Sequence, residues 1–219
     1  MRPKAAISWS GGKDSCAAYH RARADFDIIA AITMFDGEGA RSRSHGLRPE
    51  IVTAQVERLG LQGIAERCMW DTYDEAFGRA LAAARALGVT HVIFGDILFD
   101  EHREWAERLS AGSGLAAVEP LWRLSTTDLY RECLSSGTRA RIVTVRESQL
   151  DASFLGRDLA EDLLADFVAR GVDPCGERGE YHTVVTSCPA FSRPLHVRAV
   201  GRATNSGCVA EDLVLDDRV

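Results

Sequence analysis

Short apolar runs alternate with helix-like segments along the first half of the chain. Apolar and β-branched runs predict strands at residues 5–9, 28–34 and 90–94, and the second is nearly continuously apolar, which suits burial on both faces. Helical spacing of apolar residues predicts helices between these strands. Strands and helices that alternate in this way are typical of βαβ units around a parallel sheet.

Residues that start or stop helices fix the limits of the predicted ones. Pro49 suits the first position of a helix, and Gly60 suits the residue that ends it. Thr72 and Glu75 form the pattern of a capping box, and Gly88 predicts the end of that helix. We therefore expect helices at residues 13–23, 49–59 and 72–87.

The pattern changes near residue 115. Helices are expected near residues 127–134 and from Asp158, which forms a second capping-box pattern with Glu161, to residue 170. After Gly171 the chain reads as loops and strands, which predicts a small antiparallel or mixed sheet. The strands of this half are expected at residues 141–145, 181–186, 195–203 and 208–215.

These elements predict an α/β fold with two domains. A parallel-sheet, Rossmann-like domain is expected over residues 1–120, followed by a smaller C-terminal α+β domain over residues 121–219. No segment rich in Pro, Gly or Ser separates the two, so we expect a substantial interface between them.

The composition is that of an ordinary globular protein. The chain has 219 residues, of which 46% are hydrophobic, and its formal charge is −6. Binding to nucleic-acid backbone needs an excess of Lys and Arg, so the charge argues against a nucleic-acid partner. The longest uncharged apolar run, residues 28–35, is far shorter than the roughly 20 residues that span a membrane. With no signal-peptide pattern at the N-terminus, a cytoplasmic protein without a membrane anchor is expected.

The six cysteines form no C-x-x-C pair. Neither a zinc knuckle nor a thioredoxin-type motif is therefore indicated, and reduced, mostly buried thiols are expected.

Residues 10–15, Ser-Gly-Gly-Lys-Asp-Ser, lie between the first predicted strand and the first predicted helix. Glycines at such a turn let the backbone approach an anion, and the helix N-terminus supplies N–H donors. Lys13 would neutralise phosphate oxygens, the two serines would add hydrogen bonds, and Asp14 would orient the loop or hold Mg²⁺. Ile7 and Asp14 stand where a Walker A loop needs Gly and Ser or Thr, so this is a different phosphate loop. The alternative interpretation is a surface turn before a well-capped helix.

A second group of polar residues lies at residues 173–183. This segment is punctuated by glycines and carries Glu177, Glu180, His182 and Thr183 at the entrance to a predicted strand. A flexible backbone with convergent polar side chains is typical of a substrate pocket. Solvated loop acids are the alternative interpretation.

The two motifs resemble those of a known family. Residues 10–15 resemble the PP-loop of the N-type ATP pyrophosphatases, which have the adenine nucleotide alpha hydrolase-like (HUP) fold. Residues 173–183 are similar to the Cys-Gly-Glu-x-Gly-Glu-Tyr/Phe-x-Thr signature of the diphthine–ammonia ligase family. The resemblance covers essentially the whole chain and implies ATP as substrate. The residues it assigns to ATP are Ser10, Gly11, Gly12, Lys13, Asp14 and Ser15, with Met34 beside the adenine and Gly95 and Asp96 at the end of the third strand.

Further matches and two departures lie on the substrate side. Arg103, which would clamp phosphate or carboxylate, follows the family's Gly-Asp-Ile element on the next helix, and His45 lies in a glycine- and arginine-rich loop above the site. The chain has Asp-Glu-His at residues 100–102, where members often have Tyr-Gln, and His182, where others often have Glu. The departures concern the acceptor rather than ATP.

The resulting hypothesis is an ATP-dependent amide-forming ligase. An acceptor carboxylate attacks the α-phosphorus of ATP, pyrophosphate leaves, and ammonia or an amine displaces AMP from the acyl-adenylate. Lys13, the loop N–H groups and Mg²⁺ would stabilise the charge on pyrophosphate, and Glu177 and Glu180 would position the amine. The catalytic candidates are Lys13, Asp14, Glu177 and Glu180; the substrate-binding candidates are Arg103, Glu177, Glu180, Thr183 and His45; the metal ligand is Asp14.

The sequence does not fix the identity of the acceptor or the oligomeric state. Family members that complete diphthamide act on a modified histidine of an elongation factor, so the acceptor is either a modified protein side chain or a small-molecule carboxylate. The oligomeric state is open, a homodimer included. Two rival functions are a non-catalytic ATP-binding regulatory module and an RNA-modifying PP-loop enzyme, the latter normally with paired cysteines or a basic RNA-binding domain.

Overall fold

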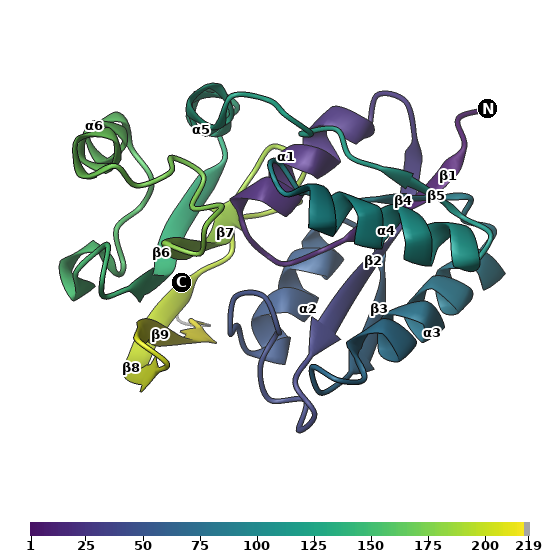
Figure 1. Cartoon of the computed structure of the whole chain (residues 1–219), viewed down its shortest axis with the longest axis horizontal. Coiled ribbons are helices and arrows are strands. Elements are labelled where there is room, and N and C mark those ends of the chain that lie inside the picture. Colours follow the sequence, from purple (N-terminus) through teal and green to yellow (C-terminus); the bar gives the residue numbers. More distant parts are fainter. Residues whose placement is uncertain (217–219) are drawn as a thin grey trace.

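A five-stranded parallel sheet forms the first half of the computed structural model, which describes residues 1–216 (Figure 1). The strand order is β3-β2-β1-β4-β5, so the order reverses at the boundary between β1 and β4. Ligands of open α/β sheets bind in the crevice at the carboxyl ends of the strands at such a point. The strands are β1 (Lys4–Ser8), β2 (Asp27–Phe35), β3 (Gln62–Arg67), β4 (His91–Ile93) and β5 (Ala116–Val118).

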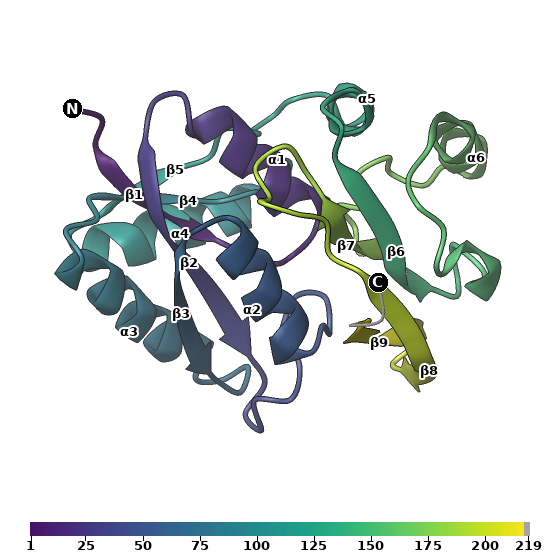
Figure 2. The same ribbon diagram turned by 180° about the vertical axis from the view of Figure 1, so that it is seen from behind.

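Helices cover both faces of this sheet (Figures 1 and 2). Ile7 and Ile93 point to the face that carries α1 (Lys13–Ala22) and α2 (Pro49–Arg58), whereas Ile32 and Val92 point to the other face. That second face carries α3 (Tyr73–Ala86) and α4 (Asp100–Gly112). Buried apolar residues on both faces explain the continuous apolar strands of the sequence, and the predicted βαβ arrangement is confirmed.

The second half contains a four-stranded antiparallel sheet in the order β7-β6-β9-β8. Two helices and one 3₁₀ turn accompany it, and the short turn between β8 and β9 has positive φ at Ser206 and Gly207, as a tight hairpin requires. The predicted small sheet is therefore antiparallel. Its elements are α5 (Thr126–Ser135), β6 (Arg139–Arg146), η1 (Ala152–Phe154), α6 (Glu161–Arg170), β7 (Tyr181–Ser187), β8 (Val197–Asn205) and β9 (Cys208–Leu215).

The two sheets share one apolar core. Fully buried residues of β1 and α1 belong to the same cluster as Ile142 of β6, Phe167 of α6 and Val184 of β7. The substantial interface expected from the sequence is therefore present. The division into residues 1–120 and 121–219 stays a prediction, and residues 217–219 lie outside the described residues.

Ion pairs tie the loop above the sheet to the second half. Arg48 donates two hydrogen bonds of 2.7 Å to the Asp212 carboxylate on β9, and Arg41 donates a third of 2.8 Å. The guanidinium groups hold the pKa of Asp212 well below its usual range. These ion pairs thus hold the glycine- and arginine-rich loop that carries Arg41 and Arg48 to strand β9.

The edge strand β3 is not among the strands that the sequence pattern predicts. Its six residues alternate between exposed and partly buried positions, so they lack the apolar run that marks the central strands.

Both predicted capping boxes are wrong. The Thr72 hydroxyl accepts a hydrogen bond from the backbone N–H of Met69 and so closes the preceding turn instead of capping α3. Asp158 forms an isolated β-bridge with Arg141 of β6, and its carboxylate accepts a hydrogen bond of 3.2 Å from the Arg141 guanidinium. Helix α6 therefore begins three residues later. In both places a tertiary or turn contact takes the side chain that the local pattern assigns to the helix.

No helix within residues 1–216 combines the length and the apolar character that crossing a membrane would take.

Candidate active site

The loop at residues 10–15 lies where the sheet order reverses. It runs from the end of β1 into α1, and Gly11 adopts a left-handed backbone with φ of 85°. A Cβ on Gly11 would lie 2.7 Å from the Gln55 side-chain oxygen, so glycine is required for two reasons. The Ser10 hydroxyl donates to that of Ser15 at 3.1 Å, which in turn donates to the Gly12 carbonyl. The structure therefore has a compact, internally bonded anion loop at a helix N-terminus.

Gln55 supports this loop and is not among the site residues predicted from the sequence. It is fully buried on α2, and its amide donates to the carbonyl oxygens of Gly11 and Val185 at 2.9 and 2.8 Å. Its oxygen accepts from the Trp9 indole at 3.0 Å. One side chain thus joins the loop to β7, a contact that no sequence spacing indicates.

Thr183 joins the loop to the second half at another point. Its buried hydroxyl accepts a hydrogen bond from the backbone N–H of Lys13 at 3.1 Å. The imidazole Nδ1 of His45 lies 2.7 Å from the Thr183 carbonyl oxygen. Two predicted substrate-side residues therefore lie directly against the phosphate loop.

Lys13 is buried as an ion pair. Its ammonium donates to the Asp14 carboxylate at 2.8 Å and also to the Cys175 carbonyl oxygen, and only 5% of its side chain is exposed. Burial is the largest influence and lowers the pKa of Lys13, but the Asp14 carboxylate, Tyr181 and Cys175 together more than offset it, so the pKa stands well above its ordinary value. The Lys13 ammonium therefore stays charged at neutral pH.

A cavity of about 470 Å³ opens beside the loop. This volume is within the range of small-molecule sites. Its walls come from both halves of the chain, and aromatic rings of Trp70, Tyr73 and Trp105 contribute to one side. The predicted site residues in its lining are Ser10, Lys13, Asp14, Ser15, His45, Gly95, Asp96, Glu177 and Thr183.

The carboxylates of Asp14, Asp96 and Glu177 face this cavity. Among the described residues that line it, Lys13 is the one buried cation. Burial, followed by the nearby Asp14 carboxylate, raises the pKa of Glu177 to about 7. Burial also raises the pKa of Asp14, an effect that Lys13 opposes and that Asp96 adds to. Carboxylates that repel one another in this way favour a further cation, and oxygen ligands suit Mg²⁺. Asp14 therefore offers the ligand chemistry that Mg²⁺ needs, and its role as a metal ligand stays a prediction.

Glu180 does not line the cavity. Its side chain is 1% exposed and accepts hydrogen bonds from the backbone N–H groups of Asp173 and Arg178, at 3.2 and 2.9 Å. The structure places Glu180 as the residue that holds the 173–180 loop in shape. Glu177, held on that loop, is the glutamate that faces the cavity.

Arg103 and Met34 also lie outside the cavity lining, as do the loop glycines Gly11 and Gly12. Arg103 pairs with Glu107 at 2.8 Å and with Glu119 at 3.5 Å, and its guanidinium lies over the Trp122 ring. Met34 is 6% exposed and contributes to a hollow of about 20 Å³ next to the cavity, room for roughly one water molecule. Adenine would enter this hollow only if the neighbouring loop moved.

Gly95 lies two residues after the end of β4, against the phosphate loop. A Cβ at this position would lie 3.0 Å from the carbonyl carbon of Asp14 and 3.0 Å from the backbone nitrogen of Ser15. The backbone at Gly95 thus lies directly against the phosphate loop, and the place of Gly95 beside ATP stays a prediction.

His182 and His45 form a stacked, half-buried pair, with ring centroids 4.8 Å apart. Burial, followed by the charges of Lys13 and Arg146, lowers the pKa of His182 to about 4. Burial and then His182 lower the pKa of His45 well below its ordinary value. Both rings are therefore neutral at pH 7.

The His182 shift predicts acid-sensitive stability. The unfolded chain binds a proton near pH 6.5 and the folded chain only near pH 4, so stability is present above pH 6.5 and is lost as the pH falls to about 4. Between these two pH values we expect His182→Gln to lose about 2 kcal/mol less unfolding free energy than the wild type. This difference is smaller than the full pKa shift would give, because the ring keeps some solvent contact. Urea unfolding at both pH values measures it, with the exposed His196→Gln as the matched control. An equal loss in all three proteins would contradict the assignment.

A Rossmann-like sheet with a glycine-rich anion loop and a cavity at the strand ends defines a nucleotide-binding α/β protein. Family models of the diphthamide synthase N-terminal and C-terminal domains match residues 3–117 and 125–214. The chain belongs to the diphthamide synthase family, as the motifs predicted. Its membership places it among the ATP-dependent carbon–nitrogen ligases.

Curated relatives carry the name diphthine–ammonia ligase. The rat and human proteins are each 28% identical to this chain, over 90% of it and 83% of their own length. The cattle protein is 27% identical over 94% of this chain and 86% of its own length. A solved structure titled as a predicted subunit of tRNA methyltransferase, from Methanocaldococcus jannaschii, is 13% identical with a TM-score of 0.45, and the match covers 85% of this chain and 98% of that one.

Proposed function

We propose that this protein adenylates an acceptor carboxylate with ATP and couples it to ammonia or an amine. The observation that carries the proposal is the meeting of the Lys13 phosphate loop and the Glu177 loop in one cavity. A polyphosphate site alone needs only the first of these. The two loops together serve both half-reactions, because the first half-reaction leaves AMP on the acceptor and the second half-reaction brings in the amine.

ATP would bind with its phosphates at the loop. Lys13 and the first-turn N–H groups of α1 offer positive charge to the pyrophosphate that leaves. Asp14 and Asp96 would hold Mg²⁺, which neutralises phosphate charge when bound. Met34 lines the hollow beside the cavity, and this supports an adenine position there, with movement of the loop that carries Ser42 and Ser44.

The acceptor would enter across the aromatic side of the cavity. Trp70 is 69% exposed and Met69 is 58% exposed, so apolar surface is available at this rim. The Arg43 guanidinium lies 4.7 Å from the centroid of the Trp70 ring and adds positive charge beside it. A carboxylate acceptor suits this combination. Diphthine, the acceptor in the name of the curated relatives, is the first candidate, and small carboxylates are the second.

Glu177 would receive the incoming ammonium and take its proton. Its pKa of about 7 lets a carboxylate in this position release and accept protons near neutral pH. We expect Glu177→Gln to raise the KM for ammonium about tenfold, a loss of roughly 1.4 kcal/mol, and to leave the KM for ATP within twofold. Steady-state kinetics at varied ammonium measures this, with Glu161→Gln at the exposed start of α6 as control. Equal changes in both KM values would mean that Glu177 serves ATP.

Product analysis tests the function itself. Purified protein is incubated with ATP, Mg²⁺ and ammonium, together with diphthine-bearing elongation factor or a panel of small carboxylates. We expect AMP and pyrophosphate in equal amounts, formed only when an acceptor is present. ATP that binds tightly and stays intact with every acceptor would instead indicate a nucleotide-sensing module.

A further inference from the structure

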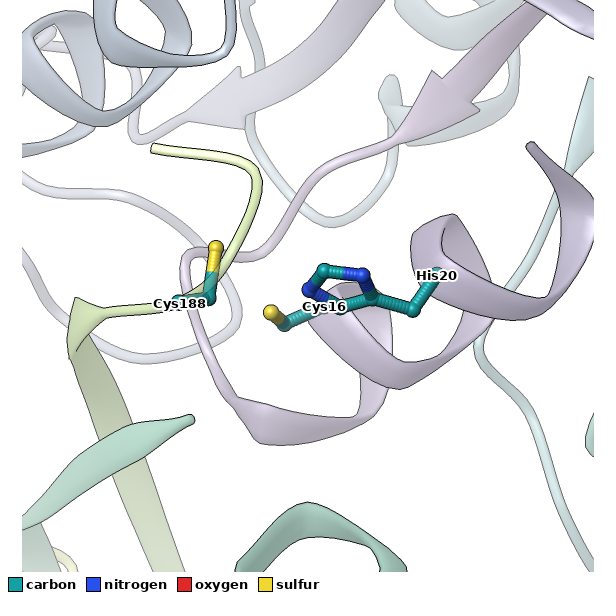
Figure 3. Close-up of side chains that lie close together, drawn as sticks. All are labelled: Cys16, His20 and Cys188. Atoms are coloured by element: carbon teal, nitrogen blue, oxygen red, sulfur yellow. The ribbon is translucent and has the colours of Figure 1, made fainter. Parts of the chain in front are cut away.

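Three side chains of metal-ligating type meet beside α1, outside the cavity. Cys16 and His20 lie four residues apart on α1 and therefore on the same face of the helix. Cys188 follows the end of β7, and the ligand atoms of all three residues lie within 4.8 Å of one another. Figure 3 shows Cys16 and His20 projecting from one helix towards Cys188 on the neighbouring segment.

The group has an unsatisfied polar atom. The Cys16 and Cys188 side chains are 1% and 5% exposed, and both thiols are free. The Nε2 atom of His20 is buried and has no hydrogen-bond partner in the part of the chain that the structure describes. A buried polar atom without a partner is costly, and native proteins rarely keep one without a reason.

We infer that Cys16, His20 and Cys188 bind one zinc ion. Thiolate sulfur and imidazole nitrogen are the ligands that zinc prefers, and a metal would satisfy the free imidazole nitrogen. A tetrahedral zinc site has ligand atoms about 3.4–3.8 Å apart, so the three side chains would close by up to about 1.4 Å. Both sulfurs would bind as thiolates, and any proton that they carry goes to solvent. The described residues add no further Cys, His, Asp or Glu to the group, so water takes the fourth position.

The position of the site gives the ion a structural consequence. Cys16 directly follows Ser15 of the phosphate loop, and Cys188 lies on the same segment as Thr183, which accepts the Lys13 N–H. Zinc would therefore fasten both walls of the ATP cavity to each other. We expect removal of the ion to lower the thermal midpoint of the full chain by several degrees.

Cobalt substitution tests the inference on the reduced 219-residue protein. Co²⁺ added to metal-free protein is expected to give thiolate-to-cobalt charge-transfer absorption and intense visible bands at one equivalent, both abolished by Zn²⁺. Cys16→Ser and Cys188→Ser should lose these bands, whereas Cys68→Ser, a buried free thiol elsewhere in the fold, should keep them.

Three results would overturn the assignment. Absence of the bands in wild-type protein whose thiols are shown to be reduced would do so, and this measurement needs no variant. Bands that persist in Cys188→Ser would place the metal elsewhere. A Cys16–Cys188 disulfide in the freshly purified protein, found by mass spectrometry, would mean that the pair is an oxidised cross-link. If Cys16→Ser does not fold, His20→Asn and Cys188→Ser give the same comparison.

Discussion

Replacing Lys13 with methionine is expected to lower kcat/KM for ATP about a thousandfold, a loss of roughly 4 kcal/mol of transition-state stabilisation. Lys13 is the one buried cation among the described residues that line the cavity, and its Asp14 partner keeps it charged. Methionine keeps the length and the apolar stem of the side chain, so the loss reports the charge. Steady-state kinetics with circular dichroism as a check of folding measures the effect.

The sequence supplies its own control, because the chain has two lysines. Lys4 is exposed at the start of β1, and Lys4→Met is expected to have wild-type kinetics. A folded Lys13→Met protein that loses less than tenfold in kcat/KM would remove Lys13 from the catalytic residues.

Gly95→Val is expected to lower kcat/KM about a hundredfold, with Gly95→Ala between it and the wild type. A Cβ at this position meets the backbone of Asp14 and Ser15 at 3.0 Å, so the phosphate loop must shift by a few tenths of an ångström for alanine and further for valine. Displacement of reacting groups by about 1 Å costs about a hundredfold in rate.

Gly78 provides the matched control for this substitution. It lies on α3 with no atom near the position of an added Cβ, so Gly78→Ala is expected to stabilise the helix by about 0.5–1 kcal/mol and to leave the kinetics unchanged. Activity in Gly95→Val equal to that of the wild type would mean that the loop tolerates displacement, and that its position does not limit catalysis.

Much of the fold was predictable because burial leaves a strong local signal. The central strands β1, β2 and β4 are apolar on both faces, and Pro49 and Gly60 mark the ends of α2 through their own backbone preferences. The edge strand β3 has no such signal. The failed caps at Thr72 and Asp158 show that a short polar side chain follows whichever partner the fold brings nearest.

The site was predictable where one segment holds the chemistry, and less so where distant segments meet. Residues 10–15 contain their own glycine turn and helix N-terminus, so their role can be proposed from the sequence. Gln55 and the cluster of Cys16, His20 and Cys188 depend on contacts across long separations in the chain. The two loop glutamates look alike in the sequence, yet folding turns Glu180 to the backbone and Glu177 to the cavity.

The most direct test of the adenylation claim follows one oxygen atom. An acceptor whose carboxylate carries ¹⁸O is converted with ATP and ammonium, and the nucleotide product is analysed by mass spectrometry. Attack of the carboxylate on the α-phosphorus predicts AMP that carries one ¹⁸O atom for each amide formed. Unlabelled AMP, label in inorganic phosphate together with ADP, or no AMP with any acceptor would contradict the proposed function.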